Sequence, residues 1–338
     1  MKILGIETSC DETSAAVLDN QIVLSNVISS QQVHLNFGGV VPELATRAHL
    51  RKVIPVVEQA LAEGGVCLAE IDGFAVTHGP GLVGALLVGL NYAKGVSAVT
   101  GKPYIGVNHI EGHVYSNFLE DSPIECPFLC LLVSGGHTQL VVVRDHLEYQ
   151  ALGKTRDDAV GEAFDKVAKL LGLPYPGGPQ IDRLAAQGDP EYTEFPLGLH
   201  KEKTFDFSYS GLKTAVLTHW QSLGAAEQER HQADVCAAFQ KAAVKILVKR
   251  TMEAAKKYGL KAVGVAGGVA ANSGLRKAMK TAGEKRGIVV HFPKMAFCTD
   301  NAAMIARAGL ERLKRGETSK ATLNAFPSLQ LGDARHLL

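Results

Sequence analysis

Residues 2–19, with the sequence KILGIETSCDETSAAVLD, form an apolar run, a polar turn and a second apolar run. Residues 128–145, FLCLLVSGGHTQLVVVRD, repeat this layout. Each segment predicts a β-hairpin with small and hydroxyl-bearing residues at its tip. Because the two hairpins open the two halves of the chain, they indicate a duplicated unit. The alternative is two unrelated domains that both begin with a hairpin.

A second correspondence follows inside each half. Residues 71–99 predict a strand, a glycine turn (HGPGLVG) and a helix, and residues 261–281 predict a strand, a glycine turn (VAGGVAANSG) and a helix. Strands that alternate with helices of this length are typical of α/β layers with mixed sheets. A duplicated α/β unit usually binds its ligand where loops of both copies converge. The 338 residues leave room for two such domains.

The composition is that of a globular protein with a small-molecule site. The net charge of +1 and the 6% of aromatic residues argue against a dedicated nucleic-acid-binding domain. Glycine is enriched, with 35 copies that cluster at the ends of apolar runs, which indicates close approach of the backbone to a ligand. The first residues do not resemble a secretion signal, and the apolar residues 81–93 are too few to cross a bilayer. We therefore expect a cytoplasmic protein with no membrane partner.

The motif His109-Ile-Glu-Gly-His113 places two imidazoles four residues apart. On a helix they would lie one turn apart on nearly the same face, where they could hold one metal ion. Two histidines and a carboxylate commonly bind zinc or ferrous iron. The alternative is the start of an amphipathic helix that carries two surface histidines.

The position of Glu111 argues against a zincin-type peptidase. That motif needs the glutamate directly after the first histidine, whereas Glu111 comes two positions later. On a helix its side chain would point roughly away from the metal face.

A third ligand has to come from another part of the chain. The segment FCTDN precedes an apolar helical run that begins at Ala302. Asp300 or Thr299 is therefore a natural N-cap of that helix, and a metal-binding carboxylate at the same place is also compatible with the pattern. The sequence leaves both readings open.

Glycine turns suggest a nucleotide-like ligand without matching a standard motif. A formal GxGxxG at residues 79–84 lacks the acidic residue that a dinucleotide site needs after the next strand, and no GxxxxGK[ST] occurs. Three further turns, at residues 134–138, 177–178 and 267–268, could cradle phosphate with backbone NH groups, although each alone could be a simple turn. Asp165 lies on a different helical face from Glu162 and Lys166, which could form a surface ion pair, so Asp165 is the better ligand candidate.

Basic residues form clusters that are typical of the solvated faces of amphipathic helices. Used together, they could bind a phosphate backbone. They are Arg47, Arg51 and Lys52; Lys241, Lys245, Lys249 and Arg250; and Arg276, Lys277 and Lys280.

Read together, the motifs resemble the TsaD family. These are IETSCDET, GGVVPELATRAHL, HGPGLVGALLVG, NHIEGH, LLVSGGHTQL, GEAFDKVAKLLGLPYPGGP, FSYSGLKT, AGGVAAN and FCTDNAAMIA. The family comprises tRNA adenosine threonylcarbamoyltransferases, formerly described as O-sialoglycoprotein endopeptidases. The resemblance extends from the N-terminus to about residue 309. The tail after Gly316 does not match the family pattern, which leaves the end of the first lobe without an expectation.

The resemblance implies an α/β fold of the actin/Hsp70-like ATPase (ASKHA) type, with two duplicated lobes around a central cleft. The first lobe would comprise residues 1–121 and about 303–338, and the second residues 122–302. One divalent metal ion per subunit, Fe²⁺ or alternatively Zn²⁺, would be held by His109, His113 and Asp300. The implied substrate-binding residues are Leu132, Val133, Ser134, Gly135, Gly136, Asp165, Gly178, Asp182 and Asn272.

The resemblance also implies the reaction. The threonylcarbamoyl group of threonylcarbamoyl-adenylate would pass to N6 of adenosine-37 in tRNAs that read ANN codons, with the metal polarising the carbonyl and AMP leaving. The implied partners are tRNA, a TsaB-like paralogue and a TsaE-like ATPase. Asp11, Glu12 and His137, at the two hairpin tips, are candidates for proton transfer. A metal-dependent glycoprotein endopeptidase and a nucleotide-gated assembly platform are the alternative functions.

Overall fold

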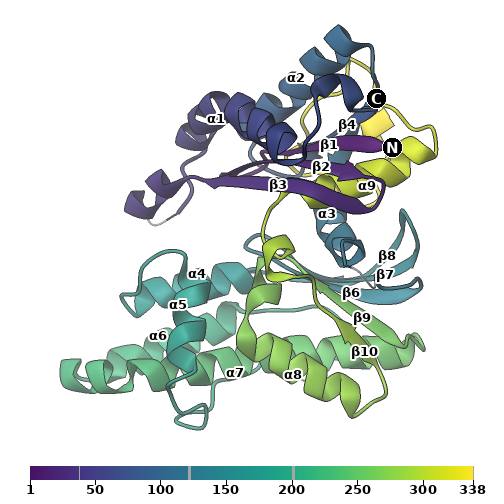
Figure 1. Ribbon diagram of the computed structural model, residues 1–338. Helices are drawn as coiled ribbons and strands as arrows, with labels where there is room; N and C mark the ends of the chain where they lie inside the picture. Colours follow the sequence, from purple (N-terminus) through teal and green to yellow (C-terminus); the bar gives the residue numbers. More distant parts are fainter. Residues whose placement is uncertain (38, 121–122, 200–201, 338) are drawn as a thin grey trace. The chain divides into compact units, whose positions relative to one another are not determined.

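The computed structural model describes residues 1–37, 39–120, 123–199 and 202–337. The chain forms two compact units (Figure 1). The first unit comprises Met1–Pro123, Asp145–Tyr149 and Pro293–Leu338, and the second comprises Ile124–Arg144 and Gln150–Phe292. The chain re-enters the first unit at Pro293, and the backbone NH of Lys294 donates to Glu120 Oε1 of that unit at 2.6 Å. Asp300 consequently belongs to the first unit.

The first unit contains a mixed five-stranded sheet in the order β3-β2-β1-β4-β5. The predicted hairpin at residues 2–19 is confirmed: β1 and β2 pair antiparallel, whereas β1, β4 and β5 are parallel. The strands are β1 (Lys2–Glu7), β2 (Glu12–Asp19), β3 (Ile22–Ser30), β4 (Gly73–Gly79) and β5 (Tyr104–Asn108). The helices are α1 (Pro42–Glu63), α2 (Val83–Thr100), α3 (His109–Tyr115) and α9 (Ala302–Lys314), with short 3-10 turns η1 (Gln32–Phe37), η2 (Leu68–Glu70), η3 (Ser116–Phe118), η5 (Met295–Phe297) and η6 (Arg335–Leu337).

The second unit repeats this sheet, in the order β10-β9-β6-β7-β8. Its hairpin pairs β6 with β7 antiparallel, and β6 and β9 are parallel, so β6 to β10 correspond in sequence and position to β1 to β5. The predicted duplication is therefore confirmed by topology. The strands are β6 (Phe128–Val133), β7 (Thr138–Asp145), β8 (Glu148–Lys154), β9 (Ala262–Ala266) and β10 (Val289–His291). The helices are α4 (Val160–Leu170), α5 (Gly177–Ala185), α6 (Ser210–Ser222), α7 (Ala225–Lys257) and α8 (Ser273–Glu284), with the 3-10 turn η4 (Gly268–Ala271).

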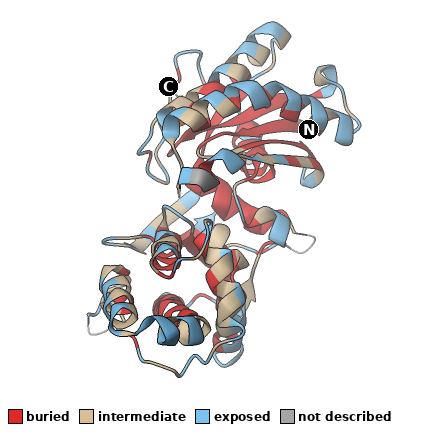
Figure 2. Ribbon diagram, turned by 90° about the vertical axis from the view of Figure 1, so that its left-hand side faces the viewer, coloured by how far each residue is buried: buried red, intermediate tan, exposed pale blue. Residues whose placement is uncertain are grey.

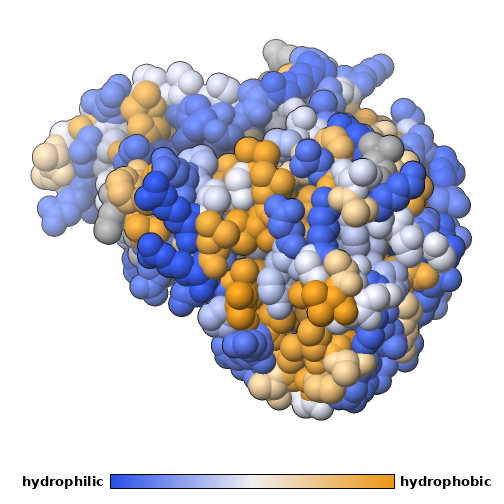
Figure 3. All heavy atoms as spheres, turned by 90° about the horizontal axis from the view of Figure 1, so that it is seen from above, coloured by the Kyte–Doolittle hydropathy of each residue, from blue (hydrophilic) through white to orange (hydrophobic). Residues whose placement is uncertain are grey.

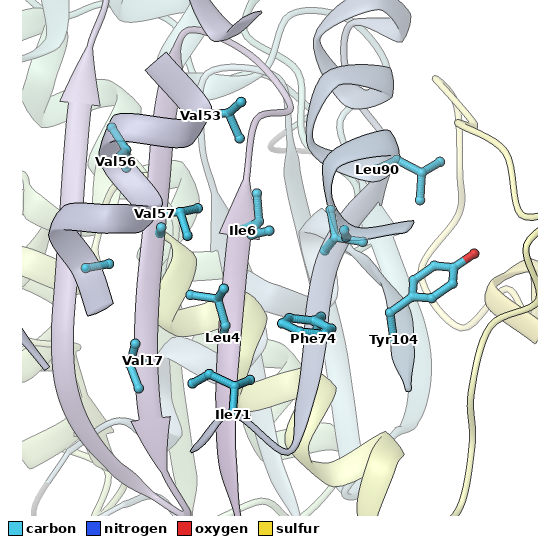
Figure 4. Packing of buried hydrophobic residues seen from close by; sticks show 14 of the residues in the cluster. Leu4, Ile6, Val17, Val53, Val56, Val57, Ile71, Phe74, Leu90 and Tyr104 are labelled. Atoms are coloured by element: carbon cyan, nitrogen blue, oxygen red, sulfur yellow. The ribbon is translucent and has the colours of Figure 1, made fainter. Parts of the chain in front are cut away.

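Strand β1 packs against α1 on one face and against the start of α9 on the other. Alternate residues of a strand point to opposite faces, and Leu4 and Ile6 pack with Val53 and Val57 of α1 (Figure 4). On the other face, a Cβ on Gly5 would lie 2.4 Å from the carbonyl oxygen of Ala302. Glycine at position 5 therefore allows the start of α9 to approach the sheet, and Figure 2 shows the strands buried between these layers.

The tail after Gly316 lies against β5, the edge strand of the first unit, and against the end of β4. The backbone NH of Phe326 donates to the carbonyl oxygen of His78 at 2.8 Å, and Ser319 Oγ accepts from the NH of Gly106 at 3.0 Å. Leu323 is part of the core. Covering an edge strand in this way protects it from pairing with another chain. Residues 317–334 form no helix or strand, so their apolar residues follow no helical or strand period.

Helix α2 is long and apolar enough to cross a membrane by length and composition, and it is the one helix in the described part of the chain that meets this test. Core helices of soluble proteins meet the same test, and Ala85, Leu86 and Leu90 of α2 are fully buried. Exposed hydrophobic side chains remain on the outer sides of α1 and α2, including Leu50, Ile54 and Val83. Figure 3 shows hydrophobic side chains gathered on the surface seen from above.

Candidate functional site

The two histidines of the sequence motif lie on one short helix at the end of β5. Asn108 caps α3, because its Oδ1 accepts from the backbone NH groups of Ile110 at 2.8 Å and Glu111 at 3.3 Å. His109 and His113 are consequently one turn apart, with ring centroids 4.7 Å from each other. Both side chains are buried. The predicted spacing on one helical face is confirmed.

Asp300 completes a cluster of three potential metal ligands. Its Oδ1 lies 3.2 Å from His113 Nε2 and 3.6 Å from His109 Nε2. The ligand atoms of the three residues all lie within 4.8 Å of one another. The N-cap of α9 is Asn301, whose Oδ1 accepts from the NH of Met304 at 3.1 Å. The expectation that Asp300 or Thr299 caps this helix is therefore wrong, and Asp300 is directed to the histidines instead.

A second group of polar residues orients His109. Its Nδ1 lies 3.1 Å from Glu7 Oε2 and 3.1 Å from Ser9 Oγ. Glu7 is held in turn, since Oε2 accepts from Thr77 Oγ1 at 2.6 Å and Oε1 accepts from the NH of Ser9. A carboxylate on one imidazole nitrogen that leaves the other nitrogen for a metal is the usual support of a metal-binding histidine. Glu7 therefore fixes the ring of His109 with Nε2 towards Asp300.

The buried polar atoms of this cluster fit a cation. His113 Nε2, which faces Asp300, is buried and makes no hydrogen bond within the described part of the chain. Buried polar atoms are normally satisfied, so a cation bound by this nitrogen would account for it. Burial opposes protonation of His109, but Asp300 and Glu7 outweigh it and raise the pKa of His109 to about 9. Imidazole nitrogens and a carboxylate gathered in a buried site are the donor set of zinc and ferrous iron.

The hairpin tip between β1 and β2 adds further acidic side chains. Burial, followed by Asp300 and Asp11, raises the pKa of Glu12 to about 9. Asp11 and Glu12 thus belong to the same electrostatic neighbourhood as Asp300, where a cation would relieve the repulsion between carboxylates. The third candidate for proton transfer, His137, lies in the second unit, in the turn between β6 and β7.

Glu111 points away from the metal ligands, as its position in the motif predicts. Its Oε2 accepts from Arg312 Nε at 2.9 Å, and Oε1 accepts from Arg312 Nη2 at 2.8 Å and from Tyr149 OH at 2.9 Å. Glu111 is fully buried. Both carboxylate oxygens are engaged in this network, so Glu111 is not available as the general base of a peptidase.

The glycine turns of the second unit come together at the ends of β6 and β9. A Cβ on Gly267, which has a φ of +96°, would lie 2.4 Å from the carbonyl oxygen of Val133. A Cβ on Gly161 would lie 2.6 Å from the carbonyl oxygen of Ser134. These two glycines therefore permit the turn after β6 to contact both the turn after β9 and the start of α4.

Other glycines of the same turns have open space in front of them. A Cβ built on Gly135, Gly136, Gly178 or Gly268 would meet no atom within 4 Å. Packing therefore does not explain glycine at these positions, whereas close approach of a phosphate to exposed backbone NH groups would. Leu132 and Val133, by contrast, are buried strand residues, so only their backbones could contact a substrate.

The three polar candidates of the second unit hold these turns in place. Asp165 Oδ1 accepts from the NH of Gly177 at 2.8 Å, at the start of α5. Asp182 accepts from the NH of Ser273 at 3.0 Å and from its Oγ at 2.8 Å. Asn272 caps α8 through Oδ1, which accepts from the NH of Leu275 at 2.8 Å. All the predicted substrate-binding residues thus lie in one unit, and their polar side chains also position the helix starts around the turns.

Two glycines at the start of η4 offer a matched test of this turn. Gly267→Ala is expected to lower the free energy of unfolding by about 1–3 kcal/mol, because alanine is strained at positive φ and would collide with Val133. Gly268→Ala should change it by less than about 1 kcal/mol, since its Cβ would occupy open space. Urea unfolding of both variants measures the difference, and equal stability would contradict the contact between the two turns.

The sequence analysis missed the residues that hold the candidate metal ligands and Glu111 in place. Glu7, Ser9, Thr77 and Arg312 are distant from the histidine motif in the sequence, and their contacts arise only from folding. One signal was available. An acidic residue that ends an apolar strand, as Glu7 does, is rarely buried without a partner.

Comparison with known proteins confirms the resemblance to the TsaD family, both by a family model and by individual relatives. A family model described as TsaD, tRNA N6-adenosine threonylcarbamoyltransferase, matches residues 22–307. Proteins described as tRNA N6-adenosine threonylcarbamoyltransferase from Clostridium kluyveri and Clostridium perfringens are each 52% identical, over 336 and 333 residues, and cover 98% of both chains. The protein of that description from Symbiobacterium thermophilum is 52% identical over 332 residues, which are 98% of this chain and 97% of the relative.

Solved structures share the fold at low sequence identity. HypF from T. kodakarensis superposes with a TM-score of 0.63 at 13% identity, covering 93% of this chain and 48% of HypF. The activator of the 2-hydroxyisocaproyl-CoA dehydratase from Clostridium difficile superposes with a TM-score of 0.53 at 14% identity, covering 95% and 100%. These structures share the α/β fold of this chain, with its two mixed sheets, and the predicted fold class is confirmed.

Proposed function

The chain belongs to the family of tRNA N6-adenosine threonylcarbamoyltransferases, and we propose on this premise which reaction it catalyses. The threonylcarbamoyl group of threonylcarbamoyl-adenylate passes to N6 of adenosine-37 in tRNAs that read ANN codons, and AMP is released. The chain is thus an acyl-transferring enzyme. The observation that carries the proposal is the 52% identity to such transferases over nearly the whole chain. The buried cluster of His109, His113 and Asp300 supports it.

One divalent cation would be held by His109, His113 and Asp300, with Fe²⁺ as the proposed ion and Zn²⁺ as the alternative. When bound, it supplies Lewis-acid polarisation of the carbonyl that is attacked. Glu7 and Ser9 keep Nδ1 of His109 engaged, so that Nε2 is the nitrogen offered to the ion. Asp11, Glu12 and His137 are the proposed groups for moving the proton that the adenosine amine loses.

The second unit would hold the adenylate. Backbone NH groups of Gly135, Gly136 and Gly178 would face the phosphate, since open space lies in front of these glycines. The backbone of Leu132, Val133 and Ser134 would border it, and Asp165, Asp182 and Asn272 would lie near the ribose and base. An adenine amine is a weak nucleophile because its lone pair is delocalised into the ring. Accurate positioning of the substrates should therefore contribute more to the rate than tight binding.

The proposed partners are tRNA, a TsaB-like paralogue and a TsaE-like ATPase, with the reaction in the cytoplasm. Exposed hydrophobic side chains on α1 and α2, such as Leu50 and Ile54, support a protein partner on the first unit. The peptidase function is disfavoured because Glu111 is engaged by Arg312 and Tyr149. An assembly platform without catalysis has no observation in its favour.

The test is reconstitution of the reaction. The chain is incubated with unmodified tRNA, threonine, bicarbonate, ATP, a threonylcarbamoyl-adenylate synthase and the two partner proteins, and the digested nucleosides are analysed by mass spectrometry. We expect threonylcarbamoyladenosine only when the chain is present. Cleavage of a glycoprotein by the purified chain, with no modified nucleoside in the complete mixture, would instead favour the peptidase.

A further inference from the structure

A groove of about 930 Å³ lies in the second unit between the C-terminal end of α5 and the facing sides of α7 and α8. Its floor is apolar and includes Ala237, Val244, Val248 and Ala278. Its rim is basic. The residues on that rim come from segments far apart in the sequence, which the packing of α7 against α8 brings to one surface.

The rim carries five cationic side chains and a single carboxylate. Lys241, Lys245 and Lys249 are spaced four residues apart on α7, so they form one exposed stripe that spans about 12 Å along the helix axis. Lys277 of α8 and Arg286, which follows α8, lie on the opposite rim. Glu253 is the acidic residue among the lining side chains.

Part of this charge is neutralised locally, and part of it is not. Lys241 pairs with Glu191 at 2.5 Å, and Lys249 lies 4.0 Å from Glu253. Lys245 and Lys277 are exposed and form no ion pair within the described part of the chain. Arg250, which the sequence grouped with these lysines, does not line the groove, because its guanidinium donates to the carbonyl oxygens of Leu199 and Glu202.

We propose that this groove binds the phosphate backbone of the tRNA substrate, with the lysine stripe of α7 and the facing Lys277 and Arg286 as the contacts. The inference rests on the proposed function for the identity of the RNA. Exposed lysines four residues apart on one helix suit a polyanion with regularly spaced charges. Contacts of lysines with phosphates carry no sequence information, so the expected contribution of this stripe is affinity that falls with salt.

The groove adjoins the proposed adenylate site without coinciding with it. The two share one edge, where Gln240 Oε1 accepts from Asn272 Nδ2 at 2.7 Å and Ser273 is bonded to Asp182. Lys245 lies more than a turn of α7 beyond Gln240, and Arg286 lies beyond the far end of α8. Phosphates in the groove would therefore belong to a part of the tRNA other than the reacting nucleoside.

The test measures the salt dependence of tRNA binding by the full chain with its partner proteins. An unmodified, fluorescently labelled tRNA transcript is titrated at several salt concentrations with the wild-type chain, with the double variant Lys245→Ala/Lys277→Ala, and with Arg230→Ala as the matched control. Arg230 is an exposed cation on the same helix, about 22 Å from Lys245 along the axis. Loss of two phosphate contacts should reduce the slope of log Kobs against log salt by about 1.4–1.8, and the control should keep the wild-type slope.

Steady-state kinetics of threonylcarbamoyladenosine formation provide a second readout. The double variant should raise KM for tRNA and leave kcat unchanged at saturating tRNA, because the lysines do not touch the reacting atoms. If the double variant keeps the wild-type salt dependence of tRNA binding and still catalyses the transfer, the groove does not bind tRNA, and the proposed function is unaffected. The proposal is also wrong if added AMP abolishes the difference in slope between the wild-type chain and the double variant, because AMP would then occupy the groove.

Two further outcomes separate the groove from the function on which it rests. If the wild-type chain forms no threonylcarbamoyladenosine but its tRNA slope still depends on Lys245 and Lys277, the proposed function fails and the RNA groove is supported. If the double variant loses its partner proteins and keeps the wild-type tRNA slope, the surface docks protein and the proposal is wrong.

Discussion

The variant His113→Ala is expected to lose nearly all of its bound metal and to transfer the threonylcarbamoyl group about 10²–10³ times more slowly, since carbonyl polarisation by a metal ion supplies several kcal/mol of transition-state stabilisation. Of the two histidines, His113 is the candidate ligand whose ring makes no hydrogen bond among the described residues. Its two ring nitrogens are buried and make no hydrogen bond in the described part of the chain, and Nε2 lies 3.2 Å from Asp300 Oδ1. Removing this imidazole leaves one histidine and one carboxylate, which is too few protein ligands for a stable site.

Elemental analysis of the purified chain measures the metal independently of activity. His291→Ala is the matched control, because His291 lies on β10 in the second unit and is only partly buried. The control should keep the wild-type metal content. A His113→Ala chain that retains stoichiometric metal, or that loses metal and remains fully active with its partners, would contradict the assignment of the cluster.

The variant Arg312→Met is expected to lower the free energy of unfolding by about 3–5 kcal/mol, because it leaves a buried carboxylate without its cation. Arg312 and Glu111 are both buried and joined by two hydrogen bonds of 2.8 and 2.9 Å. Arg312 also bonds to Glu317 at 2.7 Å and to His336, so it ties the tail to the same network. Since Glu111 lies between the two histidines of α3, loss of this brace should weaken metal binding as well.

Urea unfolding measures this effect, with Arg315→Met as the control, since Arg315 is exposed at the end of the same helix. The double variant Glu111→Leu/Arg312→Met should recover much of the lost stability, because a well-packed apolar pair often replaces a buried ion pair without loss. Equal stability of Arg312→Met and Arg315→Met would show that the network does not brace α3.

Much of the site could be predicted because its chemistry is encoded in local spacing. His109 and His113 need only a helix to share a face, and a helix at this position follows from the strand that ends at Asn108. The hairpins at residues 2–19 and 128–145 were predicted from alternating apolar and polar runs, which depend on contacts between neighbouring segments. The orientation of Glu111 followed from the helical period alone.

The choice between cap and ligand for Asp300 could not be made in this way. Asn301 and Asp300 are adjacent and both suit an N-cap, so local propensity does not separate them. The helix starts one residue later than Asp300 would need for capping, because Ala302 bonds to Ser14 on β2. That contact joins residues 288 positions apart, so it cannot be predicted from the sequence around Asp300.

The sequence by itself therefore determined the duplicated α/β architecture, the paired histidines and the glycine turns, since each depends on the periodicity of a short segment. Only the tertiary structure decided that Asp300 joins the histidines, that Glu7 orients His109 and that Arg312 holds Glu111, since each contact closes a loop of about a hundred residues or more. It also brought lysines of two separate basic runs, together with Arg286, to one groove and left Arg250 out of it. The physical reason is the same in each case: helical and strand periods fix which face a side chain occupies, whereas packing of the sheet and helices fixes which faces meet.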